Sequence, residues 1–281
     1  MAEDLRIGLL SAAELDTVVE WAATEGWNPG LADAPIFHAQ DPEGFWGLFV
    51  DGALAVSLST VRYDGGFAFV GFYICRPDLR RRGLGLKLWQ AALAGLSGRS
   101  IGLDGVVAQQ ANYATSGFVL AHRNNRYAGP APAVGAVDPR IVPVDTAVRA
   151  AVMDYDARHF GFHRPRFLAS WLVPPHGSAL ALVEDGTVKG YGVIRACRTG
   201  YRIGPLFADD PGCAEALFRA LVAGRTGEAV FLDVPEPNGA AAALAQTAGL
   251  ATVFETARMY LGPAPALPLA DIFGITSLEL G

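Results

Sequence analysis

The chain has 281 residues, enough for two domains of ordinary size or one large one. Hydrophobic residues make up 51% and charged residues 18%, which excludes an intrinsically disordered protein, because such chains have little apolar surface to bury. The formal net charge is −6, spread as −3 on each side of residue 140. A general nucleic-acid binder, which needs a basic surface, is therefore disfavoured.

The cysteines and the N-terminus indicate the compartment. Cys75, Cys197 and Cys213 are too few and too widely spaced for a disulfide framework or a C-x-x-C metal site. Glu3 and Asp4 stand where a signal peptide needs positive charge, and no apolar run reaches the length of about 18 residues that spans a bilayer. We expect a cytoplasmic protein without a membrane partner.

Turn signals and hydrophobic periodicity divide the first 130 residues into short elements. The expected strands cover residues 5–10, 47–50, 54–62, 67–75, 101–107 and 118–127. Asp51-Gly52 separates two of them as in a tight hairpin. The expected helices begin after Ser11, which has Glu14 at the capping-box position, near Gly83, and at Gln109.

The same pattern recurs after a Pro-rich segment, 131–143, which we interpret as a linker. Asp185-Gly186 repeats Asp51-Gly52, Ala248-Gly249-Leu250 repeats Ser116-Gly117-Phe118, and the segment 258–262 repeats 126–129. The three matches lie at offsets of 132 to 134 residues, which favours an internal duplication. The sequence therefore predicts two tandem copies of one α/β unit, residues 1–130 and 144–281.

The segment from Tyr73 to Trp89 carries a pattern typical of ligand binding. An apolar strand ends, a turn with Pro77 follows, and Arg80-x-x-Gly83-x-Gly85 then opens an amphipathic helix. Glycines let the backbone approach a ligand closely, and a helix N-terminus carries about half a positive charge. The pattern is neither a Walker loop nor a dinucleotide fingerprint. It predicts a phosphate-binding loop of another kind.

On these residues the chain resembles the GNAT superfamily of acyl-CoA-dependent N-acetyltransferases, and it looks closest to the branch with tandem domains. In that branch segments similar to 26–30 and 274–281 also occur. The resemblance implies an α/β (α+β) fold of two GNAT-like domains, each with a mixed, mostly antiparallel central sheet flanked by helices. It also implies acetyl-CoA as co-substrate, with the pyrophosphate on the loop and the pantetheine arm on the preceding strand. The implied cofactor-binding residues are Tyr73, Ile74, Cys75, Arg80, Arg81, Arg82, Gly83, Leu84, Gly85 and Leu86.

Two catalytic candidates follow from the same resemblance. Tyr113-x-x-x-Gly117-Phe118 matches a superfamily motif whose tyrosine is general acid to the departing thiolate, as a phenol with a pKa near 10 can be. Alternatively, Tyr113 only packs under the last strand. Asp104, in the fifth strand, is the candidate that takes the proton of the amine, or a structural carboxylate.

The acceptor site is expected between the loop before residue 46 and the second copy. The candidate acceptor-binding residues are Glu25, Trp27, Asn28, Asp33, Tyr155 and His159. His159 and His163 lie four residues apart, but Gly161 interrupts the helix and no third ligand has a recognisable spacing, so no metal is expected.

The second copy has Asp209-Asp210-Pro211 where the first has its arginines and glycines. A pyrophosphate would meet negative charge there. We expect this copy to be degenerate, to bind no coenzyme A, and to brace the first copy or wall its acceptor site.

The resemblance implies direct attack of a primary amine, of a small molecule or a peptide, on the acetyl thioester in a ternary complex. The alternative is a non-catalytic acyl-CoA-binding regulatory module. A nucleic-acid contact through the arginines at 80–82 is disfavoured by the charge of that half. The identity of the acceptor, the length of the acyl group and the oligomeric state stay open.

Overall fold

The computed structural model describes residues 3–281, and its two halves repeat one order of elements. The first half contains β1 (Leu5–Leu9), α1 (Ala12–Thr24), α2 (Asp33–Gln40), β2 (Phe45–Val50), β3 (Ala53–Tyr63), β4 (Phe67–Cys75), α3 (Leu84–Ala94), β5 (Ser100–Val106), α4 (Gln110–Thr115) and β6 (Val119–Pro130). The second half contains β7 (Ile141–Pro143), α5 (Arg149–Phe160), α6 (Pro165–Trp171), β8 (Gly177–Glu184), β9 (Thr187–Ala196), β10 (Tyr201–Ala208), α7 (Pro211–Val222), β11 (Ala229–Pro235), α8 (Gly239–Thr247), β12 (Ala251–Leu261) and β13 (Ile272–Gly274).

Local sequence signals account for most element boundaries. Ser11 and Glu14 form the expected capping box at the start of α1. The turn at Asp51-Gly52 has positive φ at both residues, and so does its repeat at residues 185–186, as a two-residue hairpin requires. The last three residues of the expected linker form the edge strand β7, which pairs with β8.

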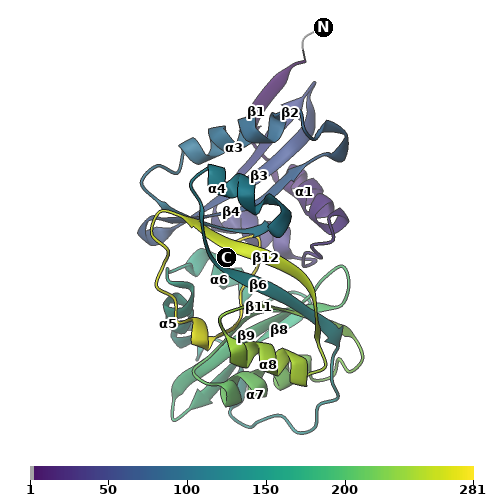
Figure 1. Cartoon of the computed structure of the whole chain (residues 1–281). Helices are drawn as coiled ribbons and strands as arrows, with labels where there is room; N and C mark the ends of the chain where they lie inside the picture. Colours follow the sequence, from purple (N-terminus) through teal and green to yellow (C-terminus); the bar gives the residue numbers. More distant parts are fainter. Residues whose placement is uncertain (1–2) are drawn as a thin grey trace.

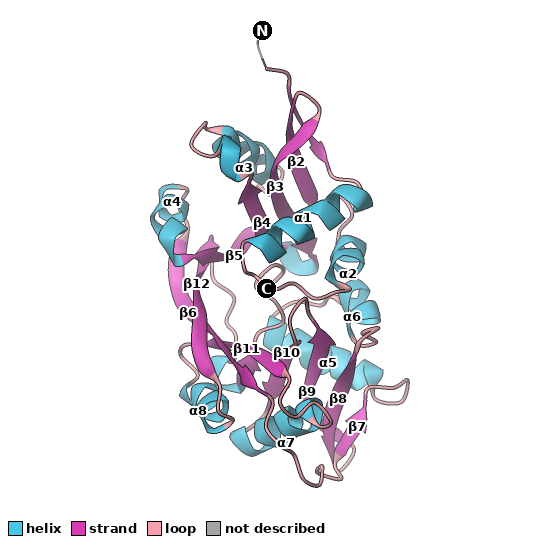
Figure 2. Ribbon diagram, turned by 90° about the vertical axis from the view of Figure 1, so that its right-hand side faces the viewer, coloured by secondary structure: helices cyan, strands magenta, loops and turns pink. Residues whose placement is uncertain are grey.

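All strands join one sheet that runs through both halves (Figures 1 and 2). The strand order is β1-β2-β3-β4-β5-β12-β6-β11-β10-β9-β8-β7, and β13 pairs with β10. Most neighbours are antiparallel, whereas β4–β5 and β10–β11 are parallel. The expected fold of mixed, mostly antiparallel sheets flanked by helices is confirmed, and the two sheets are fused into one.

The halves exchange their last strands, which the sequence did not indicate. By its place in the repeat, β6 is the equivalent of β12. Strand β12 of the second half lies between β5 and β6, and β6 of the first half pairs with β11 of the second. Figure 1 shows β6 and β12 side by side across the middle of the molecule. The division of the chain into two domains, residues 1–130 and 144–281, therefore stays a prediction. The sheet itself is continuous across both ranges.

The exchange is accompanied by two equivalent buried ion pairs. Arg126 of β6 binds Asp233 of β11 at 2.6 Å, and Arg258 of β12 binds Asp104 of β5 at 2.6 Å. All four side chains are at most 6% exposed. Because each arginine comes from the opposite half, the two pairs link the halves, and removing one partner would leave the other charge buried and uncompensated.

Helices pack against the faces of the sheet in each half, and an aromatic core fills the junction. Phe37 of α2 lies 5.9 Å from Trp171 of α6, ring centre to ring centre, so α2 and α6 join the halves on one face. Figure 2 places the C-terminus between the halves, and Tyr63 donates a hydrogen bond to the carbonyl of Leu280 at 2.8 Å. The terminal segment is therefore fixed inside the molecule. No helix within residues 3–281 is long and apolar enough to cross a bilayer.

We predict that Asp233→Ala lowers the free energy of unfolding by about 3–5 kcal/mol, because it leaves Arg126 buried without its counter-ion. Glu228→Ala, at an exposed position next to β11, is the control and should change stability little. Denaturant titration of the three proteins measures the effect. Equal stability of the two variants would show that the pair does not hold the halves together.

Candidate active site

The site begins where two parallel strands separate. Strand β4 pairs with β5 only from Phe67 to Val70, although β4 continues to Cys75 and β5 to Val106. Phe72 has φ +47 at an irregularity in the β3–β4 register, and its carbonyl accepts a hydrogen bond from Ser57 Oγ at 2.7 Å. This bulge bends β4 away from β5. The separated edge of β4 is thereby open to a ligand that forms backbone hydrogen bonds.

The N-terminus of α3 lies at the open end of these strands. Its cap is Gly83 with φ +76, and no side chain caps the helix. The first amides of a helix have no intrahelical partner, so those of residues 84–86 are available to an anion. A Cβ at Gly85 would lie 2.6 Å from the Tyr73 hydroxyl, so only glycine lets this tyrosine approach the loop. The loop therefore fits the pyrophosphate predicted for it.

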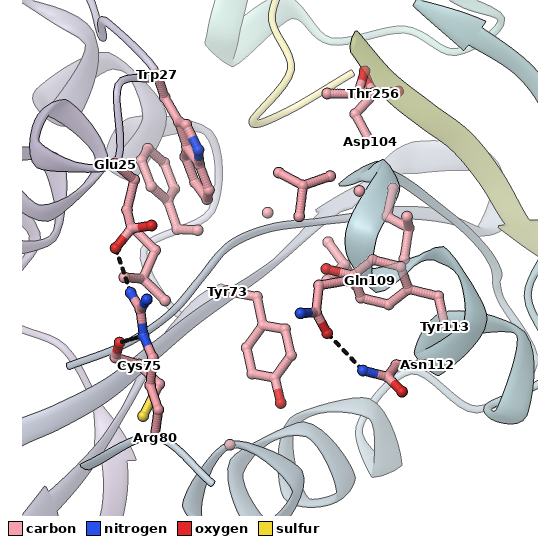
Figure 3. A pocket seen from close by; sticks show the side chains of 18 of the residues that line it. Glu25, Trp27, Tyr73, Cys75, Arg80, Asp104, Gln109, Asn112, Tyr113 and Thr256 are labelled. Carbon is pink, nitrogen blue, oxygen red and sulfur yellow. Dashed lines mark hydrogen bonds and ion pairs between the residues drawn. The ribbon is translucent and has the colours of Figure 1, made fainter. Parts of the chain in front are cut away.

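A cavity of about 920 Å³ joins the loop to the separated strands (Figure 3). Glu25 and Trp27 stand on one side of it, Gln109 and Tyr113 on the other, and Tyr73 between them. Its length runs from the α3 N-terminus along residues 71–75 to the junction of the two halves. Of the ten cofactor-binding residues predicted, all except Arg82 line it.

The three arginines of the loop have different positions. Arg80 donates to the Cys75 carbonyl at 2.9 Å and forms an ion pair with Glu25. Arg81 lines the cavity, and its backbone has a positive φ of +63°. Arg82 instead forms an ion pair with Glu3, which holds it outside the cavity lining.

Tyr113 lies where the motif predicts, at the cavity wall on α4. Its ring packs against Gly105 of β5, where a Cβ would come within 2.2 Å of the ring. Burial raises the pKa of the Tyr113 phenol, and burial also raises that of Tyr73, to about 12. Both hydroxyls therefore hold their protons at neutral pH, as a proton donor must.

Asp104 lines the cavity, but its carboxylate is already paired. Oδ1 accepts hydrogen bonds from Arg258 Nε at 2.7 Å and Asn124 Nδ2 at 2.8 Å, and Oδ2 accepts from Arg258 Nη2 at 2.6 Å. Burial raises the pKa of Asp104, and Arg258 opposes that shift. Its equivalent in the second half, Asp233, forms the corresponding ion pair. These contacts favour the structural alternative for Asp104.

Only two of the six predicted acceptor residues line the cavity, namely Glu25 and Trp27. Asn28 exchanges two 2.9 Å hydrogen bonds with the backbone of Thr199. Asp33 accepts from the Gly30 amide at 2.8 Å and from Arg195 at 2.9 Å. Asn28 and Asp33 therefore fasten the loop to the second half, because their polar atoms are used in those bonds.

Tyr155 and His159 lie on α5, away from this cavity. The Tyr155 hydroxyl donates to Asp209 at 2.7 Å, and the His159 ring stacks between Tyr155 and Phe207. Burial lowers the pKa of His159, which keeps the ring neutral. Packing inside the second half thus explains both residues. Within residues 3–281, no group of three or more His, Cys, Asp or Glu side chains is placed to hold a metal ion.

The second half supplies four cavity residues that the sequence analysis missed: Phe254, Thr256, Leu278 and Glu279. The first two come from the exchanged strand β12 and the others from the C-terminal segment. The carbonyl of Glu279 lies so close to Gly71 that a Cβ there would come within 2.2 Å of it. The similarity of residues 274–281 to the tandem branch indicated that this segment matters. No pattern in the sequence, however, predicts that residue 279 contacts residue 71.

This combination of fold and site places the chain in the acetyltransferase (GNAT) family, and the comparisons with known proteins show that it belongs there. Residues 12–118 match the "Acetyltransferase (GNAT) family" model, and residues 152–274 match the "Acetyltransferase (GNAT) domain" model. The protein is therefore a tandem GNAT acyltransferase, and its fold implies an acyl-CoA donor.

Individual relatives resemble the whole chain. The holothin acyltransferase of Pseudoalteromonas sp. (strain SANK 73390) is 31% identical over 272 residues, 96% of this chain and 92% of that protein. A putative acetyltransferase from Pyrococcus horikoshii has a TM-score of 0.85 at 21% identity over 99% of this chain and 96% of its own. A tandem GNAT protein from the clavulanic acid biosynthesis pathway has a TM-score of 0.64 at 17% identity, over 93% and 100%. The two structures show that the fold is shared.

We predict that Gly83→Asp weakens acetyl-CoA binding by about 100-fold or more, because it places a carboxylate at the helix end that receives the pyrophosphate. Gly98→Asp is the matched control, since Gly98 also has positive φ, +80, and open space around it. Calorimetric titration of both variants measures the effect. Similar affinities for the two variants would show that the loop does not bind the phosphates.

Proposed function

We propose that the protein transfers an acetyl group from acetyl-CoA to a primary amine by direct attack in a ternary complex. The observation that carries the proposal is the continuous cavity, which combines the uncapped α3 N-terminus, the open edge of β4 and the protonated Tyr113. The name of the 31% identical relative, an acyltransferase of holothin, supports an acyltransferase acting on a small molecule.

In this proposal each group has one task. The amides of residues 84–86 and the nearby Arg81 bind the pyrophosphate, and the edge of β4 at 71–75 orients the pantetheine arm towards the junction of the halves. Tyr113 donates its proton to the leaving thiolate as the carbon–sulfur bond breaks. Because the attack is direct, no nucleophilic side chain is needed.

We predict that Tyr113→Phe lowers kcat by about 100-fold, because the variant keeps the ring but loses the proton donor. Affinity for acetyl-CoA should change by less than about twofold. Steady-state release of coenzyme A and calorimetry measure the two quantities. An unchanged kcat would remove Tyr113 from the chemistry, and saturable binding of acetyl-CoA without turnover of any amine would favour the regulatory module.

We also propose that only the first copy binds coenzyme A. The equivalent helix of the second copy, α7, begins with Pro211, which lacks an N–H, and its cap Asp210 accepts a hydrogen bond from the Cys213 amide at 2.9 Å. A carboxylate therefore already occupies the anion position, and a phosphate there would meet like charge.

The number of sites tests this second proposal. Calorimetry should give one acetyl-CoA per chain, and Gly83→Asp should weaken that single site by the same factor of about 100 or more. Two equivalents per chain, or one that keeps wild-type affinity in Gly83→Asp, would contradict a degenerate second copy.

A further inference from the structure

Arg202 of β10 joins two cavity-lining segments that lie far apart in the sequence. Its Nη2 donates hydrogen bonds to the carbonyls of Trp27 and Asn28, the latter at 2.7 Å. Its Nη1 lies 3.7 Å from Oε1 of Glu279, and both side chains of this ion pair are 1% exposed. Trp27 belongs to the loop after α1, and Glu279 belongs to the C-terminal segment. One buried cation of the second copy therefore contacts both segments.

The charge of Arg202 is balanced within the protein. Besides Glu279, it faces Asp233, whose Oδ2 lies 4.0 Å from its Nε. Burial alone would lower the pKa of Arg202, but these two carboxylates raise it above its usual value. Arg202 is thus a permanent cation, and the contacts that it makes do not depend on the presence of a ligand.

The C-terminal segment lies at the end of the cavity that is far from the phosphate loop. The carbonyl of Glu279 lies against Gly71, where the pairing of β4 with β5 has just ended. The loop begins beyond Cys75, at the other end of the separated edge. A pantetheine arm that extends from the loop along residues 71–75 therefore directs its sulfur towards this segment.

Trp27 is held at the same end by two arginines. Its carbonyl accepts a hydrogen bond from Arg126 of β6 at 2.7 Å in addition to the one from Arg202 of β10. Both strands belong to the junction of the halves. Figure 3 shows the Trp27 side chain across the cavity from Tyr113. Because its backbone is fixed from the second half, the indole keeps one position opposite the proposed proton donor.

Arg195 of β9 provides a comparison within the same sheet. It is the cross-strand partner of Arg202 and is also buried, with 4% exposed. Arg195 binds Asp33 at 2.9 Å, and Asp33 does not line the cavity. The two arginines therefore share charge, burial and strand environment, and they differ in whether they hold residues of the cavity wall.

We infer that Arg202 is a positioning residue for the amine acceptor. It holds Trp27 and the C-terminal segment together, and these two parts form the wall against which the acceptor binds. This inference rests on the proposed function. It gives the copy without a coenzyme A site a role in the reaction, because that copy places the acceptor wall opposite a donor site built by the first copy.

Arg202→Lys tests the inference, with Arg195→Lys as the matched control. Lysine keeps the positive charge, but its single ammonium group cannot bridge two carbonyls and a carboxylate as the planar guanidinium does. With phenethylamine, a primary amine whose ring can pack on Trp27, we expect KM to rise about 10-fold in Arg202→Lys. The kcat, the affinity for acetyl-CoA, and the KM of Arg195→Lys should each change by less than about twofold.

Two further measurements separate positioning from a general loss of structure. Trp27→Ala removes the indole but keeps the carbonyl that Arg202 binds, so adding Arg202→Lys to Trp27→Ala should raise KM by less than about twofold. Amide hydrogen exchange, which needs no turnover, should become faster in peptides from both 26–30 and 274–281 in Arg202→Lys, with the rest of the chain unchanged. Arg195→Lys should leave the peptide 274–281 unchanged.

Four results would overturn the inference while leaving the proposed function intact. They are an unchanged KM in Arg202→Lys, an equal rise in both lysine variants, additive effects of Arg202→Lys and Trp27→Ala, and unchanged hydrogen exchange in the two segments. Binding of acetyl-CoA by the wild type without acylation of phenethylamine or hexylamine would instead count against the proposed function. The exchange measurement would then still decide whether Arg202 holds the two segments.

Discussion

The architecture depends on two reciprocal ion pairs, Arg126 with Asp233 and Arg258 with Asp104. Each joins the last strand of one copy to the fifth strand of the other, and each is buried. Buried charges tolerate little displacement, because a lost partner leaves the other charge without compensation. The two pairs therefore fix how β6 and β12 cross between the halves, and with them the continuous sheet.

This crossing explains why the site belongs to both halves. The loop at 80–85, the separated strands and Tyr113, to which the proposed function assigns the acyl-CoA donor, all come from the first copy. The far end of the cavity is closed by β12 and by the C-terminal segment, both from the second copy. The second copy thus contributes to the wall of the cavity, through β12 and the C-terminal segment and not through α5.

The two copies share a topology and differ at one helix end. In α3 a glycine with positive φ leaves the first amides free, whereas in α7 Asp210 caps them and Pro211 removes one. A change of a few residues at a helix N-terminus is enough to create or remove an anion site, because the site consists of backbone groups. Under the proposed function, the fold is therefore duplicated but the anion site is not.

Much of the protein could be predicted from its sequence, because many of its features depend on patterns within short segments. These features are the order of elements, the duplication, the loop at 80–85 and the position of Tyr113. The exchange of strands could not be predicted, because β6 and β12 have matching sequence patterns. By pattern alone, either strand could pair with β5 or with β11. For the same reason Asp104 resembled a catalytic acid until Arg258, 154 residues later, was found to be its partner. Tertiary structure alone decided which carboxylates are neutralised by a buried arginine, since pairing depends on distances in space that spacing in sequence does not encode.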